Sequence, residues 1–278
     1  MNELLENLLE EDELFRPFNK EELLSIRLRH CTKNLDGTYS CRGDLDLSGL
    51  GLTKFPVKFK RVEGSFRCRD NKLTTLEGAP EYVGGNFECS RNKLTSLKGG
   101  PQYVGHSYLC NGNLLTSLEG LPRVLEGSFH CEYNKLRTLK GCPERIEEDF
   151  ICSHNELTTL EGCPKYVGGL FSLSHNQLTL LRGVPKKVNG FFSCSNNKLT
   201  TLEGAPEWVG GSFYCMHNEL TSLKGGPRWV TLDFNCSYNK LRTLEGAPEY
   251  VGGEFVCLKN ELPPKELKKT VDRDYLKR

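Results

Sequence analysis

The sequence lacks the features that would place the chain in a membrane, in the secretory pathway or on a nucleic acid. No stretch approaches the roughly 20 consecutive apolar residues that span a bilayer. Residues 1–6 are acidic and contain neither the basic start nor the apolar run of a signal peptide. The 37 Lys and Arg residues nearly balance 36 Asp and Glu, and a net charge of +1 gives no field that would attract nucleic acid. We therefore predict a cytoplasmic protein with no nucleic-acid or membrane partner.

Sequence signatures of catalysis and of bound metal are also missing. The chain has no C-x-x-C pair and no paired His spacing of the kind that holds zinc. Its glycines recur as periodic turn residues and do not form a phosphate-binding loop. No Ser-His or Cys-His signature stands out from its repeated context. We predict a protein that is not an enzyme and that uses no metal and no cofactor.

What the sequence has in abundance is an internal repeat of 21 residues, which indicates a solenoid or a similar array. An Asn recurs at this step from Asn71 to Asn260, and no insertion or deletion breaks the register. Three positions before each Asn stands a Cys, replaced once by Leu173, and two positions earlier stands a Phe or Tyr. Leu follows each Asn at two positions and, in all but the last unit, at five; Gly and Pro follow further on.

The unit F-x-C-x-x-N-x-L resembles the core of the leucine-rich repeat, L-x-L-x-x-N-x-L, with Phe and Cys at the two strand leucines. Residues 45–52 form one more unit with true leucines, in which Leu50 replaces the Asn. The resemblance covers residues 44–262, about eleven units, and is greatest to leucine-rich-repeat proteins encoded by bacteria and bacteriophages. It implies a repeat solenoid with a curved parallel sheet on its concave face and turns or short 3-10 segments on its convex face.

Both ends of the chain differ from the repeat, and we predict three regions: a helical and hairpin cap over 1–43, the solenoid over 44–262 and a short C-terminal cap over 263–278. Asn19 and Glu22 have the spacing of a capping box at the start of a helix. Residues 34–38 predict a hairpin turn leading into a strand through Cys41. Pro263 and Pro264 end the repeat.

The thirteen cysteines are predicted to be reduced thiols, most of them packed in the core as small apolar side chains. Cys31 and Cys41 lie outside the periodic column, and we expect a disulfide between them only in an exported protein. Histidines gather just before the Asn, at His154, His175 and His217. A metal or pH-sensing role is the alternative there, but we favour a solvated polar edge because nothing in the pattern makes ligands converge.

The residues that flank each Phe and Cys should form the outer face of the sheet, because side chains alternate along a strand. Most are small and polar, among them Ser65, Asn86, Ser128, Ser172, Ser193 and Ser195. Apolar residues gather at a few positions, and we predict that these bind a partner. The predicted partner-binding residues are Leu109, Ile151, Leu170, Phe191, Tyr214 and Met216. Val256 and Leu258 are also apolar, and we expect the C-terminal cap to cover them.

Two functions remain open from the sequence. The first is a non-enzymatic protein-binding module that binds and inhibits or sequesters a host protein, in the host cytoplasm if a phage encodes it. The alternative is a structural or virion-associated component that assembles with itself through the acidic N-terminal segment or a solenoid end. We favour the first, with an unidentified protein partner and a monomeric chain.

Overall fold

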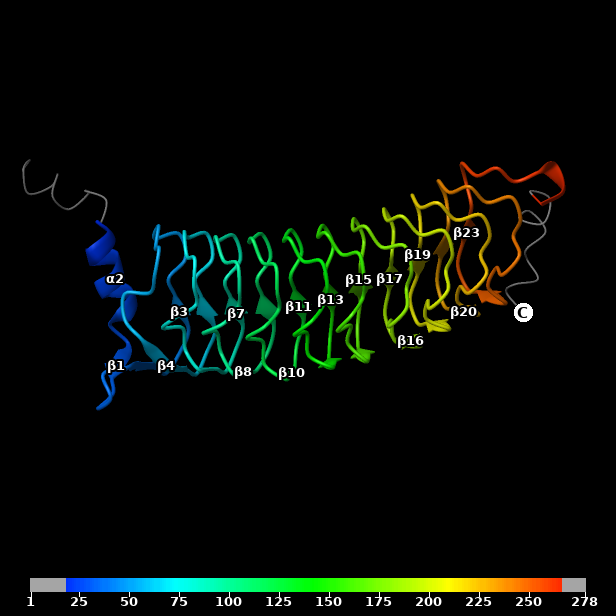
Figure 1. Cartoon of the computed structure of the whole chain (residues 1–278). Coiled ribbons are helices and arrows are strands. Elements are labelled where there is room, and N and C mark those ends of the chain that lie inside the picture. Colours follow the sequence, from blue (N-terminus) through cyan, green and yellow to red (C-terminus); the bar gives the residue numbers. More distant parts are fainter. Residues whose placement is uncertain (1–18, 267–278) are drawn as a thin grey trace, which may run out of the picture.

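The computed structural model describes residues 19–266 as one elongated stack of coils that bends gently along its length (Figure 1). Helix α2 (Lys20–Leu28) lies at one end of the stack, and a helical turn that begins at Pro264 lies at the other. The predicted repeat solenoid is therefore confirmed. Of the residues that the structure describes, none belongs to a helix long and apolar enough to cross a membrane.

One face of the solenoid is an eleven-stranded sheet that runs its whole length, with one two-residue strand from each coil. All of its strands are parallel and pair in register at a step of 21 residues, as in Phe129↔Phe150 and Phe171↔Phe192. The strands are β3 (Leu45–Asp46), β5 (Phe66–Arg67), β7 (Phe87–Glu88), β9 (Tyr108–Leu109), β11 (Phe129–His130), β13 (Phe150–Ile151), β15 (Phe171–Ser172), β17 (Phe192–Ser193), β19 (Phe213–Tyr214), β21 (Phe234–Asn235) and β23 (Phe255–Val256).

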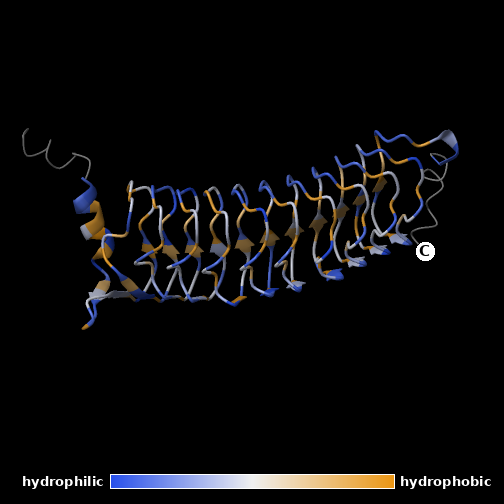
Figure 2. Ribbon diagram, viewed as in Figure 1, coloured by the Kyte–Doolittle hydropathy of each residue, from blue (hydrophilic) through white to orange (hydrophobic). Residues whose placement is uncertain are grey.

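The core lies behind this sheet and is built from the repeated Phe, Cys and Leu columns. Alternation along each strand turns the Phe and the Cys inward, and the hydrophobic strands stand out against the polar turns in Figure 2. Rings of adjacent coils stack on one another, for example Phe213 on Phe234 with centroids 5.3 Å apart. Each coil therefore buries its apolar side only against its neighbours, which is why a single coil would not fold alone.

The opposite side of the solenoid has the expected turns but differs from the sequence-based expectation in one respect. The 3-10 segments expected there as the alternative to turns are absent from residues 19–266, and the coils carry further short parallel strands. Their Val, Ile or Leu points into the core while the residue before it points out, the alternation of a strand. These strands form three smaller sheets. The first contains β4 (Phe59–Val62), β6 (Tyr82–Val83) and β8 (Tyr103–Val104) and is extended by the N-terminal hairpin; the second contains β10 (Val124–Leu125), β12 (Arg145–Ile146) and β14 (Tyr166–Val167). The third contains β16 (Lys187–Val188), β18 (Trp208–Val209), β20 (Trp229–Val230) and β22 (Tyr250–Val251).

The Asn column joins successive coils through its side-chain amides. The Asn155 amide nitrogen donates to the carbonyl of Cys152 in its own coil at 3.2 Å and to that of Cys131 in the previous coil at 3.0 Å. Its oxygen accepts from the N–H of Leu136 at 3.0 Å. Backbone groups at the bend are satisfied in this way, although the column is buried.

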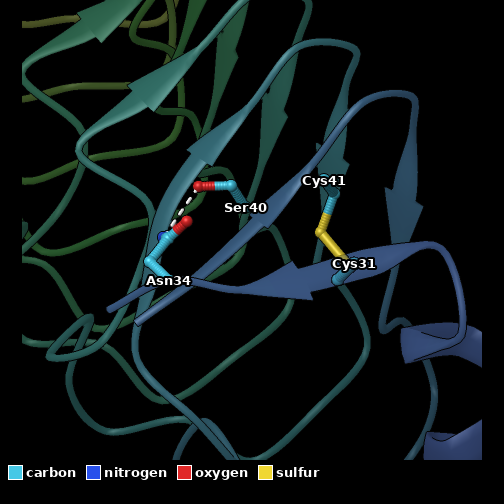
Figure 3. The surroundings of a disulfide bond; sticks show 4 residues. All are labelled: Cys31, Asn34, Ser40 and Cys41. Carbon is cyan, nitrogen blue, oxygen red and sulfur yellow. Dashed lines mark hydrogen bonds between the residues drawn. A yellow bond between two sulfur atoms is a disulfide. The ribbon is translucent and has the colours of Figure 1, made fainter. Parts of the chain in front are cut away.

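The N-terminal cap has the predicted helix and hairpin, but its cysteines differ from the prediction. Asn19 and Glu22 form the capping box of α2. Strands β1 (Cys31–Lys33) and β2 (Tyr39–Cys41) pair antiparallel, and β2 continues in parallel onto β4. This register sets Cys31 directly opposite Cys41 with Cα atoms 4.2 Å apart, and the two form a disulfide (Figure 3). The prediction of thirteen reduced thiols is therefore wrong for this pair, because a sequence pattern does not show which residues a hairpin brings face to face.

The hairpin turn is held by its own polar side chains. The Asn34 amide donates to the hydroxyl of Ser40 at 2.9 Å (Figure 3) and to that of Thr38 at 2.8 Å. Gly37 adopts the positive φ that this turn needs. Since β2 belongs to the same sheet as β4, the cap is continuous with the solenoid. The division at residues 43 and 262 stays a prediction. Most of the predicted C-terminal cap, from residue 267 on, lies outside the described residues.

Candidate functional site on the outer face of the eleven-stranded sheet

Three columns of side chains form the outer face of the eleven-stranded sheet, because each coil presents the residue before its Phe, the residue between Phe and Cys, and the residue after its Cys. The leading column is Asp44, Ser65, Asn86, Ser107, Ser128, Asp149, Leu170, Phe191, Ser212, Asp233 and Glu254. The middle column is Asp46, Arg67, Glu88, Leu109, His130, Ile151, Ser172, Ser193, Tyr214, Asn235 and Val256. The trailing column is Ser48, Arg69, Ser90, Asn111, Glu132, Ser153, Ser174, Ser195, Met216, Ser237 and Leu258.

The leading column is a ladder of hydrogen bonds between side chains and backbone. In each step a side-chain oxygen accepts from the N–H of the same position in the next coil. The bonds run without a gap from Asp44 to Leu170, with distances of 2.7 to 3.3 Å. They resume at Ser212, whose hydroxyl accepts from Asp233 at 3.2 Å, and Asp233 accepts from Glu254 at 2.9 Å. A polar residue in this column is therefore part of the structure of the sheet.

Leu170 and Phe191 interrupt this ladder. Neither side chain contains an acceptor, so within the described chain no side chain accepts from the N–H of Phe191 or of Ser212. A hydrogen bond of this kind contributes about 0.5–1.5 kcal/mol to stability. The coils of Leu170 and Phe191 lack this hydrogen bond to the next coil and present apolar side chains instead. Departures from a local structural rule of this kind are expected at functional sites.

The interruption belongs to a compact apolar group, which we call the anchor: Leu170, Phe191, Tyr214 and Met216. Phe192 is completely buried and Phe191 is half-buried on the outer face, as the repeat register predicts. The rings of Phe191 and Tyr214 meet edge to face with centroids 4.7 Å apart. The structure thus brings these two predicted residues into contact across neighbouring coils.

The solenoid can now be compared with known proteins. No family model matches the chain, and no curated protein matches it. Among solved structures it is similar to YopM from Yersinia enterocolitica WA-314, with 18% identity and a TM-score of 0.36, over 94% of this chain and 73% of that one. A second similar structure is YopM, a leucine-rich effector protein from Yersinia pestis, with 17% identity and a TM-score of 0.32, over 80% of this chain and 85% of that one.

The chain's own repeat and register decide the fold. The chain is a solenoid of parallel-stranded coils, and its repeats resemble the leucine-rich repeat. The repeated Asn bridges successive coils, and parallel strands pair at a step of one repeat.

The other two predicted partner-binding residues lie apart from the anchor. Leu109 and Ile151 sit on either side of His130 in the middle column, where β9, β11 and β13 pair. Ser172 and Ser193 separate Ile151 from Tyr214 in the same column. All six predicted residues are only partly exposed. The structure therefore divides the predicted site into a pair and an anchor of four.

Hydrogen-bonded serine side chains lie beside the anchor on the outer face of the sheet. Ser174 and Ser193 lie 2.6 Å apart between their oxygens, and Ser193 also bonds Ser195 at 3.3 Å. Ser193 and Ser195 are only 6% and 4% exposed, although the sequence predicts that both face solvent. The difference arises because large side chains of the neighbouring coil flank them: Ser193 pairs in register with Tyr214. The anchor thus lies next to small side chains that are hydrogen-bonded to one another.

The histidine column has a structure that the sequence does not reveal. The rings of Tyr133, His154 and His175 stack with centroids 4.3 and 4.1 Å apart, and His217 stacks on Tyr238 at 4.3 Å. Each of these residues has a φ between 53° and 57°, in the left-handed region. Within residues 19–266 no group of three His, Cys, Asp or Glu side chains could hold a metal ion. The stacking indicates an ordered edge of the solenoid.

A second exposed column, missed by the sequence analysis, lies on the smaller sheets at the residue before each inward Val. Its signal was the repeated aromatic or basic residue in P-x-Y-V. Tyr82 stacks on Tyr103 at 4.8 Å, and Trp229 stacks on Tyr250 at 4.2 Å. The Arg61 guanidinium lies 3.6 Å from the centre of the Tyr82 ring. Because these ring faces already contact residues of the neighbouring coils, we interpret the column as one that stabilises the packing of successive coils.

The cysteine column is buried in the core, except for Cys257 in the last coil, which is partly exposed. Burial raises the pKa of the Cys68, Cys110 and Cys215 thiols well above the ordinary value. A thiolate, the nucleophilic form, is therefore disfavoured there. Packing, not chemistry, explains this column.

Proposed function

We propose that this solenoid is a non-enzymatic protein-binding module and that its partner docks on the anchor. The observation that carries the proposal is the interrupted ladder of the leading column. At Leu170 and Phe191 alone, two successive coils exchange a hydrogen-bonding side chain for an apolar one while the residues on both sides keep the polar pattern. Core packing does not require this exchange, because Phe171 and Phe192 fill the inward positions.

The composition of the anchor supports a protein interface. Aromatic residues and Met are enriched at interface centres, where truncation of one anchor residue costs about 2 kcal/mol or more of binding free energy. Phe191 and Tyr214 already fix each other edge to face, so little side-chain entropy is lost when a partner covers them. The hydroxyls of Ser174, Ser193 and Ser195 lie beside them and bond to one another, so they leave little unpaired polar surface next to the two rings.

A binder of this kind acts by occupying the surface of its partner. We further propose that the chain inhibits or sequesters the protein it binds, in keeping with the resemblance of its repeats to bacterial and phage proteins. The alternative is self-assembly through the acidic N-terminal segment or a solenoid end. Residues 1–18 lie outside the described part of the chain. Light scattering after size-exclusion chromatography should give the mass of one chain, whereas a concentration-dependent oligomer would favour assembly.

A pull-down from a host lysate tests the proposal. The change Phe191→Ser with Tyr214→Ser should abolish capture of the partner retained by the unmodified chain. The matched control is Tyr103→Ser with Trp229→Ser, which removes two exposed aromatic residues, each 44% exposed, from the opposite sheets. Capture should survive the control. Equal capture by the anchor variant and the unmodified chain would show that the partner binds elsewhere.

A further inference from the structure

The outer face around the anchor has an unusual charge. Seven successive coils present the segments 106–112, 127–133, 148–154, 169–175, 190–196, 211–217 and 232–238 at this face, and none of them contains a Lys or an Arg. The whole chain has 37 such residues and is nearly neutral, so these seven coils differ from the first coils of the same face, which carry Arg67 and Arg69. The seven segments do contain four acidic residues: Glu132, Glu148, Asp149 and Asp233.

These four carboxylates form no ion pair within the described residues, whereas many acids elsewhere on the solenoid do. In the N-terminal coils Arg67 neutralises both Asp44, at 2.9 Å, and Glu88, at 3.1 Å. On the turns, pairs such as Lys98 with Glu119, 2.8 Å apart, join successive coils. Single acids elsewhere, such as Glu126, also have no ion pair among the described residues, but only the seven coils around the anchor combine such acids with outer-face segments that contain no basic side chain.

Two of the acids bracket the anchor directly. The leading column reads Asp149, Leu170, Phe191, Ser212, Asp233, so one carboxylate precedes the two apolar residues by one coil and the other follows them by two. With strands about 4.8 Å apart, both lie within about 10 Å of Phe191 along the stack. Each uses Oδ1 to accept a backbone N–H, from Leu170 and Glu254 respectively. The second oxygen of each has no hydrogen-bond donor among the described residues.

Glu132 adds an independent sign of a missing donor. One of its carboxylate oxygens is buried and has no hydrogen-bond partner in the described chain. Glu132 stands beside His130 in β11, on the side of the face where Leu109 and Ile151 lie. A buried carboxylate oxygen without a donor is costly unless a ligand supplies one.

We propose that the partner presents a cationic and apolar protein segment to the outer face of the eleven-stranded sheet. This inference rests on the proposed function. An apolar side chain of that segment packs on Phe191 and Tyr214, and Lys or Arg side chains on either side of it pair with Asp149 and Asp233. Charge complementarity of this kind steers association and fixes the register of docking. The same negative charge opposes nucleic acid and anionic lipid on this face.

The test uses peptides as probes and the full chain as the receptor. A random peptide library displayed on phage is selected on the unmodified chain, and a selected peptide is then synthesised and titrated by fluorescence anisotropy. We expect enriched peptides to combine an aromatic or aliphatic residue with nearby Lys or Arg. Their affinity should fall as salt concentration rises. Enrichment of only neutral or acidic peptides, or no enrichment, would overturn the proposal.

The decisive variant is Asp149→Asn with Asp233→Asn. Asn keeps the oxygen that accepts the backbone N–H, as Asn86 does in the same column at 3.1 Å, so the ladder and the fold should persist. Affinity for the cationic peptide should fall about tenfold, because two ion pairs are lost. The matched control is Glu203→Gln, which removes a charge from the turns, where Arg182 pairs with it at 3.0 Å, and should leave affinity unchanged.

The variants also separate the two proposals. If Phe191→Ser with Tyr214→Ser leaves peptide affinity unchanged, the proposed docking site itself is wrong. If that variant loses affinity but the double Asp→Asn variant does not, the site stands and only the cationic character of the partner is wrong. Vesicles of anionic lipid and a DNA duplex serve as further probes, and binding of either to this face would contradict the inference.

Discussion

Asp149 accepts a hydrogen bond from the N–H of Leu170 at 2.7 Å, and Leu170 has no atom that can repeat this bond to the next coil. The same position forms a polar ladder in the coils before and after. The polar side chains of the ladder stabilise the sheet, whereas the apolar side chains of Leu170 and Phe191 do not. Replacing either of these two by a polar residue should therefore weaken partner binding without lowering the stability of the fold.

Phe191→Ser should lower partner binding without lowering the stability of the fold. The new hydroxyl can accept from the N–H of Ser212, as Ser212 does from Asp233 at 3.2 Å, so the free energy of unfolding should stay the same or rise. Ser107→Ala is the opposite case, because it removes the hydroxyl that accepts from the N–H of Ser128 at 3.2 Å. This change should lower the free energy of unfolding by about 0.5–1.5 kcal/mol. Urea unfolding of both variants measures the difference. A large loss of stability from Phe191→Ser would mean that this ring is part of the core.

Asn155→Ala should destabilise the solenoid by about 1–3 kcal/mol, because it leaves buried backbone groups without partners. Asn260 makes equivalent bonds, with its oxygen accepting from Leu241 at 3.0 Å, but it is less buried than Asn155. Asn260→Ala should therefore cost less. The comparison is made by chemical denaturation of the two variants, and equally small losses at both positions would contradict the role assigned to the Asn column.

The cysteines of the core should react slowly with a thiol reagent while the chain is folded. Burial raises the pKa of thiols such as Cys68 and Cys110, and the reagent cannot reach them without local opening. Labelling should accelerate sharply on unfolding. Cys31 and Cys41 should become reactive only after reduction, since they form a disulfide. Mass spectrometry of the alkylated chain identifies each cysteine, and fast labelling of the core column in native buffer would contradict the inward orientation of these residues.

Acidification should slightly destabilise the fold through His154. Burial, and then the charge of His175, lower the pKa of His154 in the folded chain. The unfolded chain therefore takes up the proton more readily as the pH falls below about 6.5, and the stability present above that pH is lost. The effect is small because the ring is partly exposed. His154→Gln should weaken the dependence of the unfolding temperature on pH between about 7.5 and 5.5, whereas His106→Gln, at an exposed position, should preserve it.

Most of the fold could be predicted because every coil repeats the same physical constraints. The register of 21 residues alone assigns Phe192 to the core and Phe191 to the outer face, and the structure confirms this assignment. The same periodicity did not reveal the strands on the opposite side, because two residues per coil are too few to show an alternating pattern. It also did not reveal the Cys31–Cys41 disulfide, which depends on the register of one hairpin outside the repeat.

The candidate site could be predicted as a set of residues but not as an arrangement. Sequence reasoning selects Tyr214 and Met216 because they are apolar or aromatic against a polar background. The interruption of the leading column becomes visible only when the hydrogen bond from the N–H of Leu170 to Asp149 is seen. Ser193 and Ser195 show the converse error. They occupy outward positions, but large neighbours bury them, and a single sequence does not say how far side chains from the next coil extend.

Site-specific photo-cross-linking tests the central claim most directly. The photoreactive amino acid p-benzoylphenylalanine is introduced in place of Tyr214 on the outer face, or in place of Tyr103 on the opposite sheet, and the chain is irradiated with its captured partner. The account predicts a covalent adduct with the partner from position 214 and none from position 103. Adducts from position 103 alone would place the partner on the opposite sheet and contradict the assignment of the anchor as its binding site.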